Sequence, residues 1–368
     1  MTKNARVVVA MSGGVDSSVT AYLLKQQGYE VIGATMQIWQ DRDPDEQFNE
    51  GGCCSLSAVN DARRVADLLN IPYYVFNLKL PFKEKVMDYF IDEYLKGRTP
   101  NPCIACNRYI KFEDFLNRVL ALDAQYMATG HYARVSFDKI RERYIIRKAI
   151  DQKKDQTYVL YNLTQFQLKH TLMPLGEYTK DQVRAIAKEI GLAVADKPDS
   201  QEICFIPKND YKQFLKEKVP NKIKPGPFLD TEGNKIGEHK GLAYYTVGQR
   251  KGLGLAMGKP VYVVDLDAEN NAVIIGNEYE VLGKELLASE LNYIPFDKLE
   301  KPMKVTAKIR YTAPEKEAII IPERADSIRL VFNKPERAIT PGQSVVFYDG
   351  DLLIGGGIIK KCIKKYPT

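Results

Sequence analysis

The feature that most constrains the fold is an alternation of short apolar runs with longer amphipathic segments, from residue 6 to about residue 135. RVVVAM (6–11) and EVIGATMQIW (30–39) have the composition of buried strands, and the segment between them has helical periodicity. Gly28 and Gly97 fall where the C-caps of such helices belong. Strands that alternate with helices predict an α/β domain with a parallel sheet covered by helices on both faces.

The pattern changes after about residue 208, where glycine, proline and short β-type runs take over. A chain of 368 residues is long enough for two or three domains. The later runs predict two small β modules joined near residues 283–290. We therefore expect an α/β domain over 1–208, a small central β-rich domain over 209–286 and a C-terminal β-barrel over 287–368.

Composition limits the environment of the chain. The longest apolar run falls well short of the ~20 residues that span a bilayer, and the first residues lack a signal-peptide core. We expect no membrane association and a cytoplasmic location. Six cysteines are too sparse for a disulfide scaffold, so close cysteine pairs indicate metal or redox chemistry. A net charge of +6 permits a polyanionic partner without demonstrating one.

The segment VVVAMSGGVDSS (7–18) leads from the first strand through glycines into a helix. Such a turn presents backbone N–H groups and the positive end of a helix dipole to a phosphate, although it could also be a plain capped turn. It lacks the Lys-Ser or Lys-Thr of a Walker A loop and is not GxGxxG. It resembles SGGxDS, the pyrophosphate loop (PP-loop) of ATP pyrophosphatases, which implies ATP binding with Mg²⁺ near Asp16.

A nucleophile must follow adenylation, and a thiolate is the strongest side-chain candidate. NPCIACN (101–107) holds Cys103 and Cys106, and Cys204 lies in DKPDSQEICFI (196–206). We expect Cys106 at the start of a helix, where the dipole, Arg108 and Lys111 favour the thiolate.

Several motifs in one order extend the resemblance across essentially the whole chain: NPCIACN, ATGHYAR (128–134), KKDQTYVL (153–160), DKPDSQEICFI, YTVGQRKGLG (245–254), KIRYTA (308–313) and PGQSVVFYDGD (341–351). Together they resemble the bacterial tRNA-specific 2-thiouridylase family. The resemblance implies a PP-loop catalytic domain, a central domain and a tRNA-binding barrel. It also implies ATP-dependent 2-thiolation of the wobble uridine, by adenylation of the C2 oxygen with release of pyrophosphate.

The resemblance also implies residue roles. Cys204 would receive sulfur as a persulfide from a cysteine desulfurase or relay protein. Cys106 would attack the adenylated C2 and later close a disulfide with Cys204, leaving 2-thiouridine and AMP. ATP would contact Ala10, Met11, Ser12, Gly13, Gly14, Val15, Asp16, Ser17, Met36 and Gly130. The tRNA anticodon stem-loop would contact Asn101, Pro102, Cys103, His131, Lys154, Asp155, Gln156, Arg310, Tyr311 and Gln343.

Cys103 departs from the better-known form of the family, which has Asp at this position. With Cys106 and Cys204 it could hold an iron–sulfur cluster that leaves one iron open, or serve a redox relay. A structural zinc site lacks a fourth soft ligand. We favour the persulfide route, with the cluster as its competitor. We expect no catalytic role for Cys53 and Cys54, and we place Cys362 on a solvated basic tail.

Two other functions compete with thiolation. Another adenylating PP-loop enzyme, such as a lysidine-forming or amidating synthetase, needs no paired thiols. A non-catalytic tRNA-binding protein that uses ATP as a structural ligand would release no pyrophosphate when tRNA is added. The intact small and acidic residues of SGGVDS (12–17) argue against the second of these.

Overall fold

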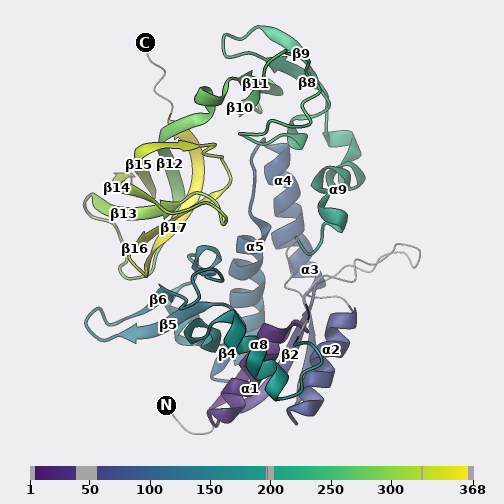
Figure 1. Cartoon of the computed structure of the whole chain (residues 1–368), viewed down its shortest axis with the longest axis vertical. Helices are drawn as coiled ribbons and strands as arrows, with labels where there is room; N and C mark the ends of the chain where they lie inside the picture. The colour runs from purple at the N-terminus through teal and green to yellow at the C-terminus, as the bar shows by residue number, and fades with distance from the viewer. Residues whose placement is uncertain (1–4, 39–55, 196, 198–202, 325, 364–368) are drawn as a thin grey trace.

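The structure is a computed structural model that describes residues 5–38, 56–195, 197, 203–324 and 326–363. The described residues form three β-sheets with helices gathered around the first of them (Figure 1). No helix in these ranges combines the length and the apolarity needed to cross a membrane. Cys53 and Cys54 lie outside the described residues.

The first sheet is parallel, as the alternating sequence pattern predicts. Its strand order is β3-β2-β1-β4-β7, and each neighbouring pair is parallel. Its strands are β1 (Arg6–Ala10), β2 (Glu30–Gln37), β3 (Tyr73–Asn77), β4 (Tyr126–Ala128) and β7 (Thr171–Leu172). Strand β1 lies in the middle, and its three valines are completely buried.

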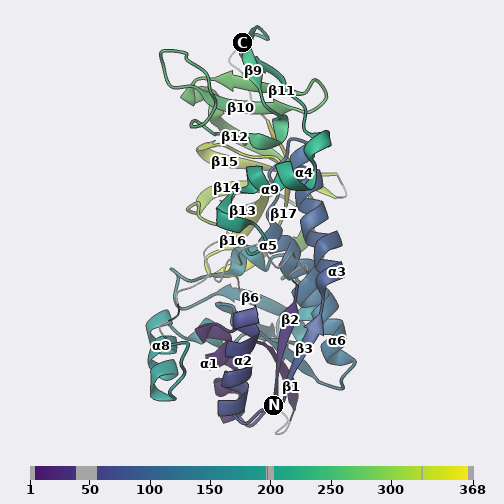
Figure 2. The ribbon, with the colours of Figure 1, turned by 90° about the vertical axis from the view of Figure 1, so that its right-hand side faces the viewer.

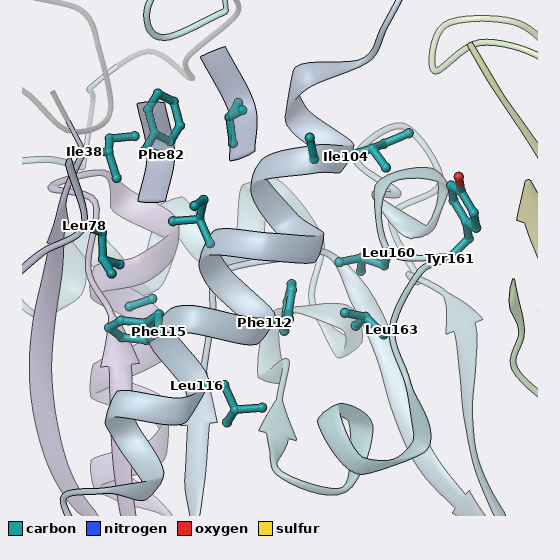
Figure 3. Packing of buried hydrophobic residues seen from close by; sticks show 14 of the residues in the cluster. Ile38, Leu78, Phe82, Ile104, Phe112, Phe115, Leu116, Leu160, Tyr161 and Leu163 are labelled. Atoms are coloured by element: carbon teal, nitrogen blue, oxygen red, sulfur yellow. The ribbon is translucent and has the colours of Figure 1, made fainter. Parts of the chain in front are cut away.

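Helices cover both faces of this sheet, because side chains along a strand alternate between its faces. Val7 and Val9 point into one core, with α1 (Val15–Gln26), α2 (Leu56–Leu68) and α8 (Lys180–Glu189). Val8 and Ala10 point into the other core, shown in part in Figure 3. Its helical segments are α3 (Lys79–Phe82), η1 (Lys83–Asp88), α4 (Tyr89–Leu95), α5 (Pro102–Ala105), η2 (Cys106–Phe115) and α6 (Leu116–Leu120).

The predicted helix ends are confirmed at Gly28 and Gly97. Gly28 (φ +85°) follows α1 and Gly97 (φ +68°) follows α4. These positive φ angles suit glycine because it has no Cβ to clash with the backbone.

A small four-stranded sheet follows, with the order β10-β11-β8-β9. Its strands are β8 (Gly226–Leu229), β9 (Lys235–His239), β10 (Tyr262–Asp267) and β11 (Ala272–Gly276). The remaining short segments that come before this sheet in the chain are η3 (Thr157–Val159), α7 (Gln165–Lys169), η4 (Pro174–Glu177), η5 (Pro207–Asn209), α9 (Tyr211–Lys218) and η6 (Pro220–Lys222). Segment η7 (Leu242–Tyr244) lies between β9 and β10, and η8 (Glu278–Val281) follows β11.

The C-terminal strands form a closed antiparallel barrel, which confirms the predicted fold class. The order β12-β15-β14-β13-β16-β17 closes through pairing of β12 with β17. The strands are β12 (Leu282–Tyr293), β13 (Met303–Lys308), β14 (Lys316–Arg324), β15 (Ser327–Arg337), β16 (Ser344–Asp349) and β17 (Leu352–Ile363). Strand β12 runs through the expected domain boundary at 286/287. Figure 2 shows this barrel between the other two sheets.

Two features of the barrel differ from expectation. The hairpin β5 (Ala133–Asp138) and β6 (Arg143–Lys148), which belongs to the α/β part of the sequence, adds to the barrel sheet beside β17. Cys362 does not lie on a solvated tail: it is a half-buried residue of β17 that packs against the barrel core. The prediction was wrong because a lysine-rich edge hid the alternating apolar residues of a strand.

Candidate active site

The PP-loop joins the end of β1 to α1 at the carboxyl edge of the sheet. Gly13 has φ +68°, and a Cβ on it would lie 2.3 Å from the Ala58 carbonyl oxygen. Ser12 donates its backbone N–H to Ser17 Oγ at 3.1 Å, and Ser17 Oγ donates to the Gly14 carbonyl at 3.2 Å. Gly14 is the N-cap of α1 and no side chain caps it. The first turn of α1 is therefore built as an anion-binding helix terminus.

Gly130 lies against this helix terminus from the neighbouring strand. A Cβ at this position would be 2.9 Å from Ser17 N and 3.0 Å from the Asp16 carbonyl carbon. No side chain longer than hydrogen fits without moving the loop. Behind the loop, Met11 is 2% exposed, and its carbonyl accepts a hydrogen bond of 2.6 Å from Thr35 Oγ1. Met36 is half-buried and packs on the core that contains Val8 and Ala10, here called the main core.

Three side chains that sequence reasoning missed surround the loop. Lys180 Nζ lies 2.8 Å from both carboxylate oxygens of Asp16, and Tyr132 OH donates to the same carboxylate at 2.8 Å. Lys197 Nζ donates to the Gly13 carbonyl at 3.2 Å and pairs with Asp61 at 2.9 Å. A loop without a Walker lysine thus has two lysines brought to it from more than 160 residues away.

The sequence contains signals that locate each of these residues locally, but none that shows they meet. Thr179 and Gln182 form a capping box at the start of α8, and Lys180 is the first residue of that helix. Lys197 lies within DKPDSQEICFI, and Tyr132 within ATGHYAR. Their spacing in the sequence does not indicate that they meet at Asp16.

The thiol segment NPCIACN begins a helix one turn earlier than predicted. The Asn101 side chain accepts from the backbone N–H groups of Cys103 (3.1 Å) and Ile104 (3.2 Å), and Pro102 follows it in the first turn. Cys106 is therefore not at the helix start: it begins the π-helical segment η2 and is half-buried on the main core. Cys103 is exposed in the first turn, so the dipole argument applies to Cys103.

Cys204 is exposed between two side chains that are packed inward. Ile203 and Phe205 contact the same core cluster as Cys106. The Phe205 ring lies 5.7 Å from Phe82 and 5.4 Å from Phe90, measured between centroids. The core thus anchors the backbone around Cys204 and leaves its thiol at the surface.

The barrel reaches the segment 154–156 through Tyr311, which is 41% exposed. Its OH lies 3.4 Å from the Asp155 carbonyl oxygen, and Lys308 Nζ lies 5.8 Å from its ring centroid. Burial raises the pKa of Tyr311, the negative charge of Asp155 raises it further, and the positive charge of Lys154 opposes this. Tyr311 and the segment 154–156 therefore share one surface.

A continuous path of contacts joins the PP-loop to this surface. Asp16 accepts from Tyr132 OH, and the Tyr132 backbone N–H donates to Gln156 Oε1 at 3.0 Å. The Gln156 backbone N–H in turn donates to the Tyr132 carbonyl at 3.0 Å. Asp155, its neighbour, contacts Tyr311 from the barrel. The nucleotide loop and Tyr311 of the barrel thus lie at two ends of one connected network.

Several residues expected at a tRNA interface are engaged inside the protein. His131 is 8% exposed and its Nδ1 lies 2.8 Å from Thr129 Oγ1. Burial and the nearby Lys111 hold the pKa of His131 well below its usual range. Arg310 donates to the Arg337 carbonyl at 2.7 Å, and Gln343 donates to the Thr99 carbonyl at 2.8 Å. Cys103 and Tyr311 are exposed, and Lys154 is half-buried.

The described residues hold no group of three or more His, Cys, Asp or Glu side chains placed to bind a metal ion. Cys103, Cys106 and Cys204 therefore do not converge as a cluster ligand set in this structure. Asp16, expected near Mg²⁺, has Lys180 as its counter-ion.

The parallel sheet, the SGGVDS loop and the glycine pressed onto α1 define a nucleotide-binding domain of the HUP class. A family model described as "tRNA methyl transferase HUP domain" matches residues 5–208. Two further models match 212–277 ("tRNA methyl transferase PRC-barrel domain") and 283–359 ("Aminomethyltransferase beta-barrel domain").

Full-length relatives identify the family more narrowly. The chain is 63% identical over 364 residues to "tRNA-specific 2-thiouridylase MnmA 2" of Caldanaerobacter subterraneus subsp. tengcongensis, covering 99% of this chain and 100% of the relative. It is 62% identical over 355 residues to "tRNA-specific 2-thiouridylase MnmA" of Acetivibrio thermocellus, covering 96% and 99%. The chain belongs to the tRNA-specific 2-thiouridylase family. Among solved structures, NMN synthetase from Francisella tularensis is similar at 15% identity and a TM-score of 0.35, over 57% of this chain and 72% of that one, too weakly to carry an argument.

Proposed function

We propose that this protein catalyses ATP-dependent 2-thiolation of the wobble uridine of tRNA. Full-length relatives named as 2-thiouridylases support the reaction. The structural observation that carries it is that the barrel contacts both ends of the site: Tyr311 joins the hydrogen-bonded path that leads to Asp16, and Gln343 bonds the backbone just before the helix that holds Cys103 and Cys106. Adenylation and sulfur transfer must act on one base, so the two ends must be held together. Transfer of a methyl group, which the descriptions of the domain models name, has no need of paired thiols.

The PP-loop is the proposed ATP site. Backbone N–H groups at the start of α1 would hold the phosphates, with Ser12 to Ser17 around them and Gly130 allowing close approach. Lys180 and Lys197 would supply the positive charge that a Walker lysine supplies elsewhere. Ala10, Met11 and Met36, which lie at the carboxyl ends of β1 and β2, would lie nearest the adenosine part of ATP. Mg²⁺ would arrive with ATP and take most of its ligands from phosphate and water, as this ion commonly does.

The proposed reaction has two stages, adenylation of the uridine at the PP-loop and sulfur transfer from the cysteines. The uridine O2 attacks the α-phosphorus of ATP, pyrophosphate leaves, and C2 becomes open to a sulfur nucleophile. Cys204 carries the sulfur as a persulfide, and Cys106 is its partner thiol. We now assign the attack on C2 to the Cys204 persulfide: its outer sulfur bonds to C2 and AMP leaves. The Cys106 thiolate then attacks Cys204 Sγ, which breaks the bond to the outer sulfur, releases 2-thiouridine and forms a Cys106–Cys204 disulfide that a reductant must later open. Since the three thiols form no ligand group, no step is assigned to an iron–sulfur cluster.

The tRNA would bind across the helix that holds Cys103 and Cys106, the segment 154–156 and the barrel. Lys154 and Tyr311 would contact the backbone and the unstacked bases of the anticodon loop, because the target base must leave the stack to expose C2. Asn101, Pro102, Asp155, Gln156, His131 and Arg310 would shape this surface from beneath. A cysteine desulfurase or sulfur-relay protein would load Cys204, whose thiol is exposed.

We further propose that the protein works in the cytoplasm, where thiols are kept reduced. We divide it into a PP-loop catalytic domain over 1–208, a central domain from 209 and a tRNA-binding barrel. Because β12 begins at Leu282, we now place the start of the barrel there instead of at 287.

A single-turnover reaction tests the proposal. Metal-stripped protein carrying persulfide on Cys204 is mixed anaerobically with ATP, Mg²⁺ and unmodified tRNA, and nucleosides are read by mass spectrometry. We expect 2-thiouridine and pyrophosphate, loss of thiolation in Cys106→Ser and Cys204→Ser, and normal thiolation in the matched control Cys362→Ser. Thiolation that returns only with iron and sulfide would favour the cluster. Pyrophosphate release by the parent protein without any 2-thiouridine, even with iron and sulfide added, and at the same rate in both serine variants, would favour another PP-loop enzyme.

A further inference from the structure

One turn of the barrel is hydrogen-bonded to the segment 98–100, which leads into the helix that holds Cys103 and Cys106 (102–115), here called the thiol helix. The turn Pro341–Gln343 joins the end of β15 to β16, and it lies against residues 98–100. The Thr99 backbone N–H donates to the Pro341 carbonyl at 2.9 Å. Gln343 Nε2 donates to the Thr99 carbonyl at 2.8 Å and to the Pro100 carbonyl at 3.3 Å. Three hydrogen bonds therefore connect the barrel to the backbone just before Asn101.

The fit at this turn is close on both sides. Gly342 is buried with φ +90°, and a Cβ on it would lie 2.9 Å from both Arg98 Cβ and Thr99 N. Its own N–H donates to the Ile359 carbonyl at 2.9 Å. The turn is thus bonded to β17, the last barrel strand, and also contacts residues 98–99, just before the thiol segment. Movement of one would move the other.

The next residue carries this connection into the thiol helix. Asn101 follows Pro100 and caps the helix by accepting from Cys103 N and Ile104 N. Between this helix and the barrel lies a cavity of about 40 Å³, lined by residues of both, including Ile104, Arg108 and Ser344.

We propose that Gln343 is a positioning residue that sets the placement of Cys103 and Cys106 according to the position of the barrel. Its amide donates to the carbonyls of Thr99 and Pro100, just before the thiol segment, so the barrel surface around Tyr311 is the part left to contact RNA. A tRNA that binds the barrel then orders the thiol helix through the turn. This inference rests on the proposed function for its tRNA step, and its thiol step is independent of it.

Two variants test the inference. Gln343→Ala removes the donor, and Gln343→Glu keeps the shape but sets a carboxylate against two carbonyl oxygens. The matched control is Gln165→Ala, because Gln165 also bridges the α/β part and the barrel, donating to the Tyr144 and Ile294 carbonyls at 3.0 Å, away from the thiols. Iodoacetamide alkylation of Cys103, read by peptide mass spectrometry without tRNA, reports thiol placement, and filter binding reports tRNA affinity. Melting temperatures identify misfolded variants.

We expect both Gln343 variants to change the alkylation rate of Cys103 at least threefold and to lower kcat at least tenfold, with tRNA Kd within twofold of the parent. Gln165→Ala should leave all three unchanged. A tRNA Kd raised tenfold with unaltered alkylation would overturn the inference and make Gln343 an RNA contact. Unchanged alkylation and kcat would overturn it as well. If the parent does not thiolate tRNA, the proposed function fails, and the alkylation result still judges the positioning role.

Discussion

The ion pair between Lys180 and Asp16 gives a sharp prediction about the PP-loop. The Lys180 side chain is 8% exposed and that of Asp16 is 29% exposed. Removing one partner of a fully buried pair costs about 3–5 kcal/mol, and an exposed pair contributes about 0–1 kcal/mol. Because Asp16 reaches solvent, we expect Lys180→Met to lower the free energy of unfolding by about 2 kcal/mol. For a domain of this size that is a fall in Tm of about 4–8 °C.

Asp16→Asn leaves the Lys180 ammonium buried without its anion, so we expect a similar loss. The double variant should lose less than the sum of the two, by about 1.5 kcal/mol, since it removes both charges. Calorimetric melting of the nucleotide-free protein measures this coupling. Additivity within about 0.5 kcal/mol, the scatter of independent sites, would refute the reasoning. If Lys180 also serves the phosphates, titration calorimetry should find ATP binding about tenfold weaker in Lys180→Met and largely restored in Lys180→Arg.

Three further predictions concern the loop, its neighbouring histidine and the RNA surface. Gly130→Ala should lower ATP affinity at least tenfold by titration calorimetry, because its Cβ would push on Ser17 N. Burial lowers the pKa of His131, so below about pH 6.5 the unfolded chain binds a proton that the folded protein does not bind. The free energy of unfolding should therefore decrease as the pH is lowered below about 6.5, by up to about 1.4 kcal/mol per pH unit, and less steeply in His131→Asn. Because a base is expected to stack on Tyr311, Tyr311→Ala should weaken the free energy of tRNA binding by about 1–3 kcal/mol, and Tyr311→Phe should bind like the parent. The Kd of all three proteins should rise with salt concentration. A salt-independent Kd, or equal losses in Ala and Phe, would contradict this use of the barrel.

Local pattern was enough to predict the sheet and its nucleotide loop. Strand and helix periodicity, the cap glycines and SGGVDS depend on neighbours within one or two turns of chain, so the sequence carries them directly. The same local logic misplaced Cys106, because Asn101 and Pro102 start the helix earlier than NRYIKFEDFL alone suggests. It also misjudged Cys362, whose strand is recognisable only once β12 pairs with it.

By itself, the sequence determined the parallel sheet, the PP-loop, the barrel and, through its motifs, the family. Only the tertiary structure decided which groups meet: Lys180 and Lys197 at the PP-loop, Tyr311 on the segment 154–156, the hairpin β5–β6 on the barrel, and Gln343 on residues 99–100. The reason is physical. Periodicity and backbone constraints act within a few residues, whereas these contacts join residues up to more than 200 positions apart and are set by how the separate cores pack against one another.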